Sequence, residues 1–162
     1  MSDIYNSLYR DLEPGKYSDG APNPIKLAMG LAWETYFERC LIGSGVDASR
    51  PGEFTTDEGI IGSPDLLIFN GHEKIGEIKL TYYSASTDLS DPKFGKWLTQ
   101  VMGYGHYLQI PRVRFYVLFV NGAYREGKRD PVLRVYDIEF SNRELKENWD
   151  MLMNHARQKN LI

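Results

Sequence analysis

The stretch GSPDLLIFNGHEKIGEIKL (residues 62–80) contains two apolar runs separated by an Asn-Gly pair at positions 70–71. Asn-Gly between two such runs is a strong signal for a tight turn, so we predict a β-hairpin here. Three charged residues, Asp65, Glu77 and Lys79, lie within the runs and not at the turn. Their positions in an otherwise apolar hairpin call for a physical explanation.

The hairpin geometry predicts that these charges meet. Residues two apart in a strand share a face, so Glu77 and Lys79 point the same way. Folding the chain about Gly71 places Asp65 directly across from Glu77, with Cβ atoms about 5 Å apart. Two carboxylates this close repel each other unless positive charge lies between them. Lys79 is one candidate, and a hard divalent cation such as Mg²⁺ or Mn²⁺ suits the site better.

The alternative is an exposed hairpin face with a weak surface salt bridge, which is a common arrangement. Two observations count against it. The charges are surrounded by the apolar runs LLIF and IGEI, which favour a central hairpin. Pro64 also precedes Asp65 directly and constrains the entry into the strand, which favours a carboxylate held in position.

The rest of the chain predicts helices on either side of these strands. Apolar residues at helical spacing predict helices over residues 24–42 and 93–108, and Ser141 with Glu144 predicts a capping box that opens a last helix to about Lys159. A short amphipathic helix is predicted around Ile4, Leu8 and Leu12, followed by a turn-rich segment at 13–24. Strands are predicted over residues 54–60 (weak), 61–70, 72–83, 113–122 (central) and 132–140.

This order, α-β-β-β-α-β-β-α after the short first helix, predicts the α/β (α+β) class with a central mixed sheet flanked by helices. The 162 residues fit a single domain over 1–162. On the helix at 24–42 we predict one face made of Leu27, Leu31, Glu34, Tyr36, Phe37 and Leu41. Cys40, the one cysteine, excludes a disulfide within the chain and is expected to be a buried free thiol.

Charge and hydropathy limit the function classes. The net charge is −3, so binding to nucleic acid would rest on local basic patches. The candidates are Lys93, Lys96, Arg112, Arg114, Arg125, Lys128 and Arg129. The alternative for each of them is ordinary solvated surface. Neither a signal peptide nor a run of about 18 apolar residues is visible, so we expect a cytosolic protein without a membrane partner.

The hairpin residues resemble the PD-(D/E)xK nuclease superfamily. Pro64-Asp65 on the first strand matches the PD element, and Glu77-Ile78-Lys79 on the second matches ExK. The resemblance covers roughly residues 25–140. It implies a restriction-endonuclease-like catalytic core there, with 1–24 as an N-terminal extension and 141–162 as a C-terminal helix.

Two further motifs resemble the RecB-like branch of the superfamily, which includes phage exonucleases. The run Gly30-Leu31-Ala32-Trp33-Glu34 matches that branch's GxxxE signature, and Gln100-Val101-Met102-Gly103-Tyr104 matches its QxxxY signature on the helix after ExK. All four motifs stand in the family order. Unlike several members, the chain has no GxxxxGK[ST] loop and too few cysteines for an iron–sulfur cluster, so it resembles a nuclease core without a motor.

The resemblance implies roles for the site residues. Asp65 and Glu77 would hold one or two Mg²⁺ or Mn²⁺ ions together with the main-chain carbonyl of Ile78. Glu34 would be a further ligand, directly or through water, although a helix carboxylate is often just exposed. Lys79 would orient or help to deprotonate the attacking water, or serve only as a salt-bridge partner.

The QxxxY residues also carry alternatives. Gln100 would support the lysine or contact substrate, and Tyr104 would lie against the site or the DNA. The spacing of Tyr104 fits core packing equally well. His72 and His106 are read as non-catalytic, because oxygen ligands already complete a site for Mg²⁺.

The sequence therefore predicts a metal-dependent DNA nuclease acting on single- or double-stranded DNA in replication, recombination, repair or phage DNA metabolism. The RecB-like motifs favour an exonuclease or end-processing enzyme over a structure-tolerant endonuclease. The alternatives are a catalytically inactive nucleic-acid-binding module of the same descent and a scaffold protein with chance matches. A homo-oligomer and a replication or recombination partner protein remain open, in a bacterial or phage-infected cell.

Overall fold

The computed structural model describes residues 1–14 and 23–162, which form four helices and a mixed five-stranded sheet. The helices are α1 (Ser2–Leu12), α2 (Pro24–Gly43), α3 (Gly95–Leu108) and α4 (Asn142–Gln158). The main sheet has the order β1 (Ala48–Ser49), β4 (Leu66–Ile68), β5 (Lys74–Thr81), β6 (Arg112–Phe119) and β7 (Val132–Glu139). Only β5 and β6 are parallel neighbours; the other pairs are antiparallel. The predicted α/β class with a mixed sheet between helices is confirmed.

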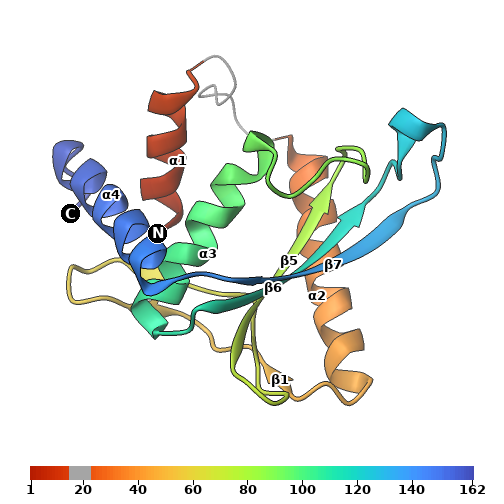
Figure 1. The fold of residues 1–162 in the computed structure, drawn as a ribbon, viewed down its shortest axis with the longest axis horizontal. Helices are drawn as coiled ribbons and strands as arrows, with labels where there is room; N and C mark the ends of the chain where they lie inside the picture. Colours follow the sequence, from red (N-terminus) through yellow and green to blue (C-terminus); the bar gives the residue numbers. More distant parts are fainter. Residues whose placement is uncertain (15–22) are drawn as a thin grey trace.

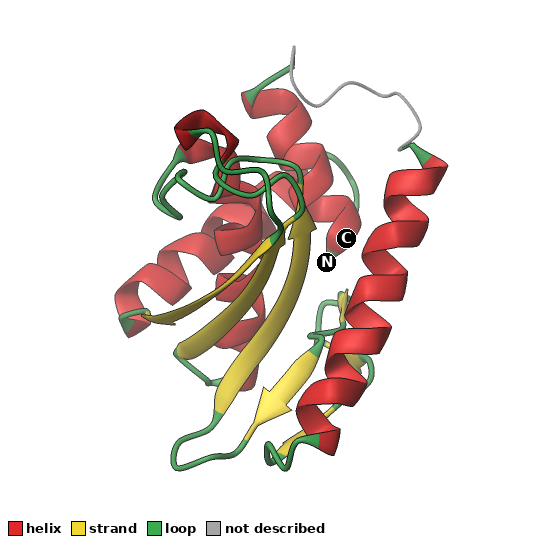
Figure 2. Cartoon of the chain, turned by 90° about the vertical axis from the view of Figure 1, so that its right-hand side faces the viewer, coloured by secondary structure: helices red, strands yellow, loops and turns green. Residues whose placement is uncertain are grey.

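The helices divide between the two faces of the sheet. Helix α2 stands alone on one face, and α1, α3 and α4 gather on the other (Figures 1 and 2). Of the predicted turn-rich segment at 13–24, residues 15–22 lie outside the described residues. Within the described ranges, the helices are too short or too polar to cross a membrane.

The hairpin forms as predicted. Strands β4 and β5 pair antiparallel, with Leu66 opposite Gly76 and Ile68 opposite Lys74, which is the register that folding about Gly71 gives. Gly71 has a φ of 81°, a value that glycine adopts without the steric cost of a side chain. The Asn-Gly pair therefore sets the register on which the position of Asp65 depends.

The prediction of one continuous strand over residues 61–70 is wrong, because this segment forms two separate strands. Ile61–Gly62 is β3 and pairs with β2 (Phe54–Thr55) in a separate two-stranded sheet, while β4 begins only at Leu66. Pro64 stands in the break and has no N–H to donate to a strand partner. The weak strand predicted at 54–60 is reduced to β2, and β1 was not predicted.

The later elements agree with the sequence. Strand β6, which was predicted to be central, lies inside the sheet between β5 and β7 with most of its side chains buried, but β5 takes the middle position of the five strands. Helix α4 opens with the predicted capping box: Ser141 accepts from the N–H of Glu144, and the Glu144 carboxylate accepts from the N–H of Ser141. In α1, Ile4 and Leu8 are buried against α3 and α4, whereas Leu12 is 61% exposed.

The predicted face of α2 is only partly right. The residues that pack on the sheet are Trp33, Phe37 and Leu41, which contact a small cluster on β4, β5 and β6. Leu27 and Leu31 are instead more than half exposed, at 53% and 55%. The apolar residues of α2 are spread around the helix, and the sheet beneath it includes strands of only two and three residues, so much of its apolar surface is left uncovered.

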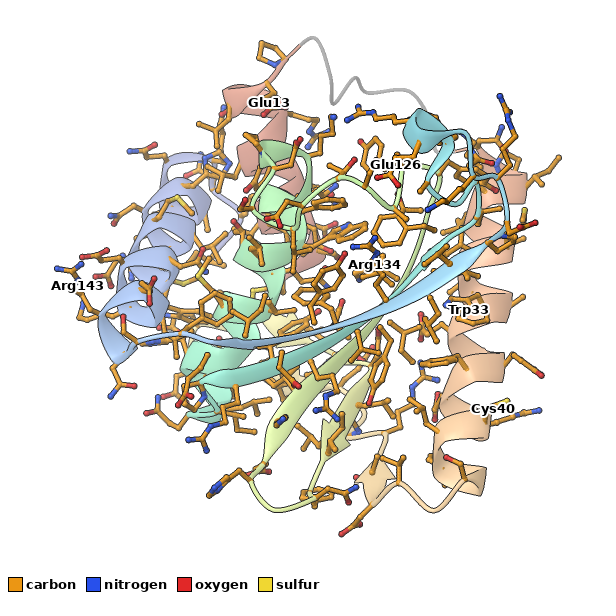
Figure 3. The ribbon with its side chains drawn as sticks, turned by 45° about the vertical axis from the view of Figure 1, so that its right-hand side comes forward. Glu13, Trp33, Cys40, Glu126, Arg134 and Arg143 are labelled. Atoms are coloured by element: carbon orange, nitrogen blue, oxygen red, sulfur yellow. The ribbon has the colours of Figure 1, made fainter. Side chains whose placement is uncertain are left out.

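Two further expectations on α2 are wrong. Tyr36 was predicted to lie on the packed face of the helix, but it is 65% exposed. Cys40 was expected to be buried, but its thiol lies on the outer side of the helix, as Figure 3 shows. Cys40 lies one helical turn after Phe37, but its position in the sequence did not show which side of α2 faces the sheet, because apolar residues occupy both sides of the helix.

Candidate functional site

The structure brings Asp65 next to the Glu77-Ile78-Lys79 segment. The Oδ2 atom of Asp65 accepts a hydrogen bond from the backbone N–H of Ile78 at 2.7 Å. Asp65 lies one residue before β4, at the point where this strand leaves the side of β5. Because the β4–β5 ladder stops at Leu66, the backbone N–H of Ile78 donates to the Asp65 carboxylate in place of a backbone carbonyl of β4.

Glu77 is the most unusual residue of this site. It is completely buried in the middle of β5. Its Oε1 accepts from the ammonium group of Lys79, but its Oε2 is buried without a hydrogen-bond partner. Burial raises the pKa of Glu77 to about 7, against the attraction of Lys79 and with the negative charge of Asp65 adding to the shift. A buried carboxylate oxygen without a partner is costly, so its retention needs a reason.

Lys79 remains the positive charge of the site. Burial lowers its pKa, but the carboxylates of Glu77 and Asp65 outweigh burial and leave the pKa above the ordinary value. Its ammonium group is therefore protonated at neutral pH. Because Glu77 and Lys79 are two apart in β5, both side chains lie on the α1–α3 face of the sheet, as the sequence predicted.

Glu34 belongs to the same electrostatic cluster but is held by another residue. Burial raises its pKa, and the negative charge of Asp65 raises it further. Arg50 forms an ion pair with Glu34 and lies 3.6 Å from Glu38 one turn later. Nothing in the turn Ser49-Arg50-Pro51-Gly52 signalled this role, because the partner is set by the packing of the turn against α2.

The site offers two carboxylates and a carbonyl to a cation. In residues 1–14 and 23–162, no three His, Cys, Asp or Glu side chains lie together closely enough to form a metal-binding group. The Ile78 N–H points to Asp65, and the N–H and C=O of one strand residue leave on the same side, so the Ile78 carbonyl points to Asp65 too. Together with the unpartnered Oε2 of Glu77, these oxygens fit a hard divalent cation. Glu34 would join them only by leaving Arg50.

The QxxxY residues lie over Glu77. The side-chain amide of Gln100 donates to the hydroxyl of Tyr104 at 2.8 Å, and Lys79 is bound to Glu77 instead. Tyr104 is 4% exposed and packs edge-on against Phe54, so the core-packing role holds. Burial and the nearby charge of Glu77 raise the pKa of Tyr104. Tyr104 is therefore a core residue that lies within the electrostatic range of Glu77.

Tyr5 of α1 is a site residue that the sequence did not predict. Burial raises its pKa, and the charges that act on it next are those of Lys79 and Glu77. Its ring lies 5.5 Å from the ammonium group of Lys96. The neighbouring apolar residues Ile4 and Leu8 predicted a helix here, but only the fold shows that this helix packs against α3 and α4 and brings Tyr5 under the charges of Lys79 and Glu77.

The predicted basic residues separate into three groups. Lys93 and Lys96 lie beside the site, on the η1 turn (Pro92–Phe94) and on α3. Arg125, Lys128 and Arg129 are exposed in and after the η2 turn (Tyr124–Glu126), between β6 and β7. The third group, Arg112 and Arg114, lies at the start of β6 and is taken up by ion pairs with β7.

The ion pairs of this third group place it apart from the hairpin carboxylates. Arg112 contacts Glu139 at 3.1 Å, and Arg114 donates to both oxygens of Asp137, at 2.8 and 2.6 Å. Arg114 is opposite Gly76 in the sheet and therefore points to the α2 face, away from the Glu77 side chain. Hydrogen bonds from Arg114 lower the pKa of Asp137 to about 2.

The two histidines that the sequence analysis set aside as non-catalytic, His72 and His106, lie outside the cluster. His72 is exposed next to the Asn-Gly turn, and His106 stacks on Trp149 with ring centroids 5.1 Å apart. Burial lowers the pKa of His106.

Comparisons with known proteins support the fold. No protein-family model and no curated protein matches the chain. A solved structure described as "Crystal structure of SSO0001" superposes with a TM-score of 0.52 at 16% identity, covering 92% of this chain and 67% of that chain. At this identity the likeness shows a shared fold and nothing more.

Proposed function

We propose that the protein is a metal-dependent DNA nuclease that hydrolyses phosphodiester bonds at the Asp65–Glu77–Lys79 site. The observation that carries the proposal is the fully buried Glu77, whose Oε2 has no partner while Asp65 and Lys79 lie beside it. A purely structural ion pair gains nothing from a spare buried oxygen, whereas a ligand needs one. The motifs that resemble the PD-(D/E)xK superfamily and its restriction-endonuclease-like core support the same reading.

Each residue has a task that follows from its contacts. Mg²⁺ or Mn²⁺, when bound, would supply an activated water and relieve charge on the scissile phosphate. Asp65, Glu77 and the Ile78 carbonyl would hold it. The protonated Lys79 would orient the attacking water and offset phosphate charge. Gln100 and Tyr104 would keep bulk water from the buried side of Glu77.

Substrate and setting follow from the same motifs. The RecB-like GxxxE and QxxxY signatures favour an exonuclease or end-processing enzyme over a structure-tolerant endonuclease. We expect the enzyme to act in the cytosol of a bacterial or phage-infected cell, in DNA replication, recombination or repair.

A second candidate is a DNA-binding module of the same descent that no longer cuts. The observation that favours it is the Arg50–Glu34 ion pair, which takes one predicted ligand away from the site. Retention of Asp65, Glu77 and Lys79 together argues against it.

Cleavage assays decide between the two. Labelled linear and circular DNA, single- and double-stranded, is incubated with the protein in Mg²⁺, Mn²⁺ or EDTA. We expect metal-dependent cleavage of linear DNA that is lost in Asp65→Asn. The absence of cleavage on every substrate with either metal would sink the nuclease proposal, and cleavage of circular DNA would assign an endonuclease.

A further inference from the structure

A pocket lies beyond the end of β5, next to the proposed active site. Its volume is about 510 Å³, within the range of roughly 300–1,000 Å³ that is usual for ligand sites. Figure 1 shows β5 pointing to the end of the molecule where α2 and α3 begin. The lining residues come from the start of α2, the end of β5 and the segment directly after it, the η1 turn and the start of α3: Lys26, Leu80, Thr81, Tyr82, Tyr83, Lys93, Lys96 and Trp97.

The pocket combines positive charge with aromatic rings. The ammonium group of Lys26 lies 5.0 Å from the ring centroid of Tyr82, and that of Lys93 lies 5.7 Å from the ring centroid of Tyr83. The Tyr83 side chain is more than one-third exposed and open to solvent. Lysine side chains bind the phosphate groups of a nucleic acid, and aromatic rings stack on its bases regardless of base sequence. The pocket's three lysines could bind phosphates, and its two tyrosines and one tryptophan offer rings for base stacking.

The pocket lies next to the proposed active site along β5. Its wall contains Leu80 and Thr81, the two residues that follow Lys79 in β5. The charge of Lys79 is also felt by Lys96, whose pKa is lowered by burial and then by Lys79. A strand whose phosphate lies at Lys79 would therefore place its next nucleotide in the pocket.

We infer that this pocket binds one unpaired nucleotide of single-stranded DNA beside the scissile phosphate, with its base on Tyr82 or Tyr83 and its phosphate at the lysines. This inference rests on the proposed function for the identity of the substrate. Bases in a duplex stack on each other and do not reach a ring in a hollow, whereas unpaired bases do. The enzyme would then act on single strands or on frayed ends.

The test is binding measured in EDTA, where no cleavage occurs, by fluorescence anisotropy of a labelled single strand and of a blunt duplex of the same length. We expect the single strand to bind at least about tenfold more tightly. Of Tyr82→Leu and Tyr83→Leu, the variant that removes the ring under the base should weaken single-strand binding about 5- to 150-fold, the equivalent of one lost base stack, whereas both Phe variants should stay close to wild type.

Tyr83 packs edge-on against Phe94, so thermal melting must show that its Leu variant is folded. Lys93→Gln gives an independent test that spares the core. It should reduce the slope of log affinity against log salt by about 0.7 for single strands, and Lys146→Gln on the far helix α4 should leave the slope unchanged.

Unchanged single-strand affinity in folded Leu variants, or an equal loss for duplex, would overturn the inference. Because binding is read without metal, a protein that cuts nothing in Mg²⁺ would disprove the nuclease proposal alone, and the pocket would still be decided by the binding data.

Discussion

Two clusters of acidic and basic side chains lie on this sheet, one at the surface across β5, β6 and β7 and one in the interior at β5, and they differ in how fully the acid is bonded. At the surface, Asp137 accepts from Arg114 and from Lys74, so both of its oxygens are bonded and its pKa is lowered to about 2. In the interior, Glu77 bonds only Lys79, keeps one buried oxygen without a partner, and has its pKa raised by burial to about 7. Both carboxylate oxygens of the surface cluster have partners within the chain, whereas one carboxylate oxygen of the buried cluster has none. The incomplete cluster is the one that we expect to bind a ligand.

The largest expected effect is on the rate of DNA cleavage, which should depend on the buried cluster and not on the surface cluster. Asp65→Asn should reduce the single-turnover cleavage rate of linear DNA in Mg²⁺ by about 10³-fold or more, because it removes a charged ligand while keeping the shape of the side chain. Asp137→Asn is the matched control at the surface cluster and should cleave at the wild-type rate. Equal rates in the two variants would contradict the proposed site.

The second effect concerns stability. Lys79→Met leaves the buried Glu77 without a positive partner, and loss of one member of a buried pair costs about 3–5 kcal/mol. A carboxyl group whose folded pKa lies above its ordinary value loses folded-state stability as pH rises between those two values. The loss in Lys79→Met should therefore be larger at pH 8 than at pH 5.5, as measured by urea unfolding.

Lys74→Met tests the corresponding position in the surface cluster. Its pair with Asp137 is partly exposed, so the expected loss is below about 1 kcal/mol at either pH. A loss in Lys79→Met as small as that in Lys74→Met would mean that the buried pair is not tightly coupled.

The third effect is the pH dependence of metal binding. A cation at Glu77 competes with the proton, and the pKa of about 7 makes that proton harder to displace at pH 6 than at pH 8. We expect the Mn²⁺-induced rise in melting temperature to be greater at pH 8, with an apparent affinity about tenfold weaker at pH 6. Glu77→Gln should abolish the rise, and a rise that persists there would place the metal elsewhere.

The smallest effect lies in the surface cluster at acid pH. The lowered pKa of Asp137 means that its contribution to stability is present above about pH 4 and is lost as pH falls towards 2. Asp137→Asn should reduce the free energy of unfolding at pH 7 by less than about 1 kcal/mol and have a smaller effect at pH 2, where about half of the Asp137 carboxyl groups of the folded protein are protonated. Melting temperatures across that range provide the measurement.

The sequence correctly predicted those structural features that are determined by residues close together in the chain. The Asn-Gly turn gave the hairpin register, period two gave the shared face of Glu77 and Lys79, and Ser141 with Glu144 gave the start of α4. These signals succeed because turn geometry and strand alternation are set by adjacent residues.

Features that depend on distant partners could not be read in this way. The apolar residues around α2 do not say which side meets the sheet, so Cys40 was expected in the core and lies outside it. Arg50 reaches Glu34 only because its turn packs against α2, and Tyr5 comes under the charges of Lys79 and Glu77 only because α1 packs against α3 and α4. These parts of the candidate site became visible only with the fold.

We propose that the unpartnered oxygen of Glu77 and the carboxylate of Asp65 bind one divalent cation. The most direct measurement is anomalous diffraction from a crystal soaked in Mn²⁺. We expect a peak in contact with Asp65, Glu77 and the Ile78 carbonyl. No peak there, or a peak only at the Asp137 cluster, would contradict it.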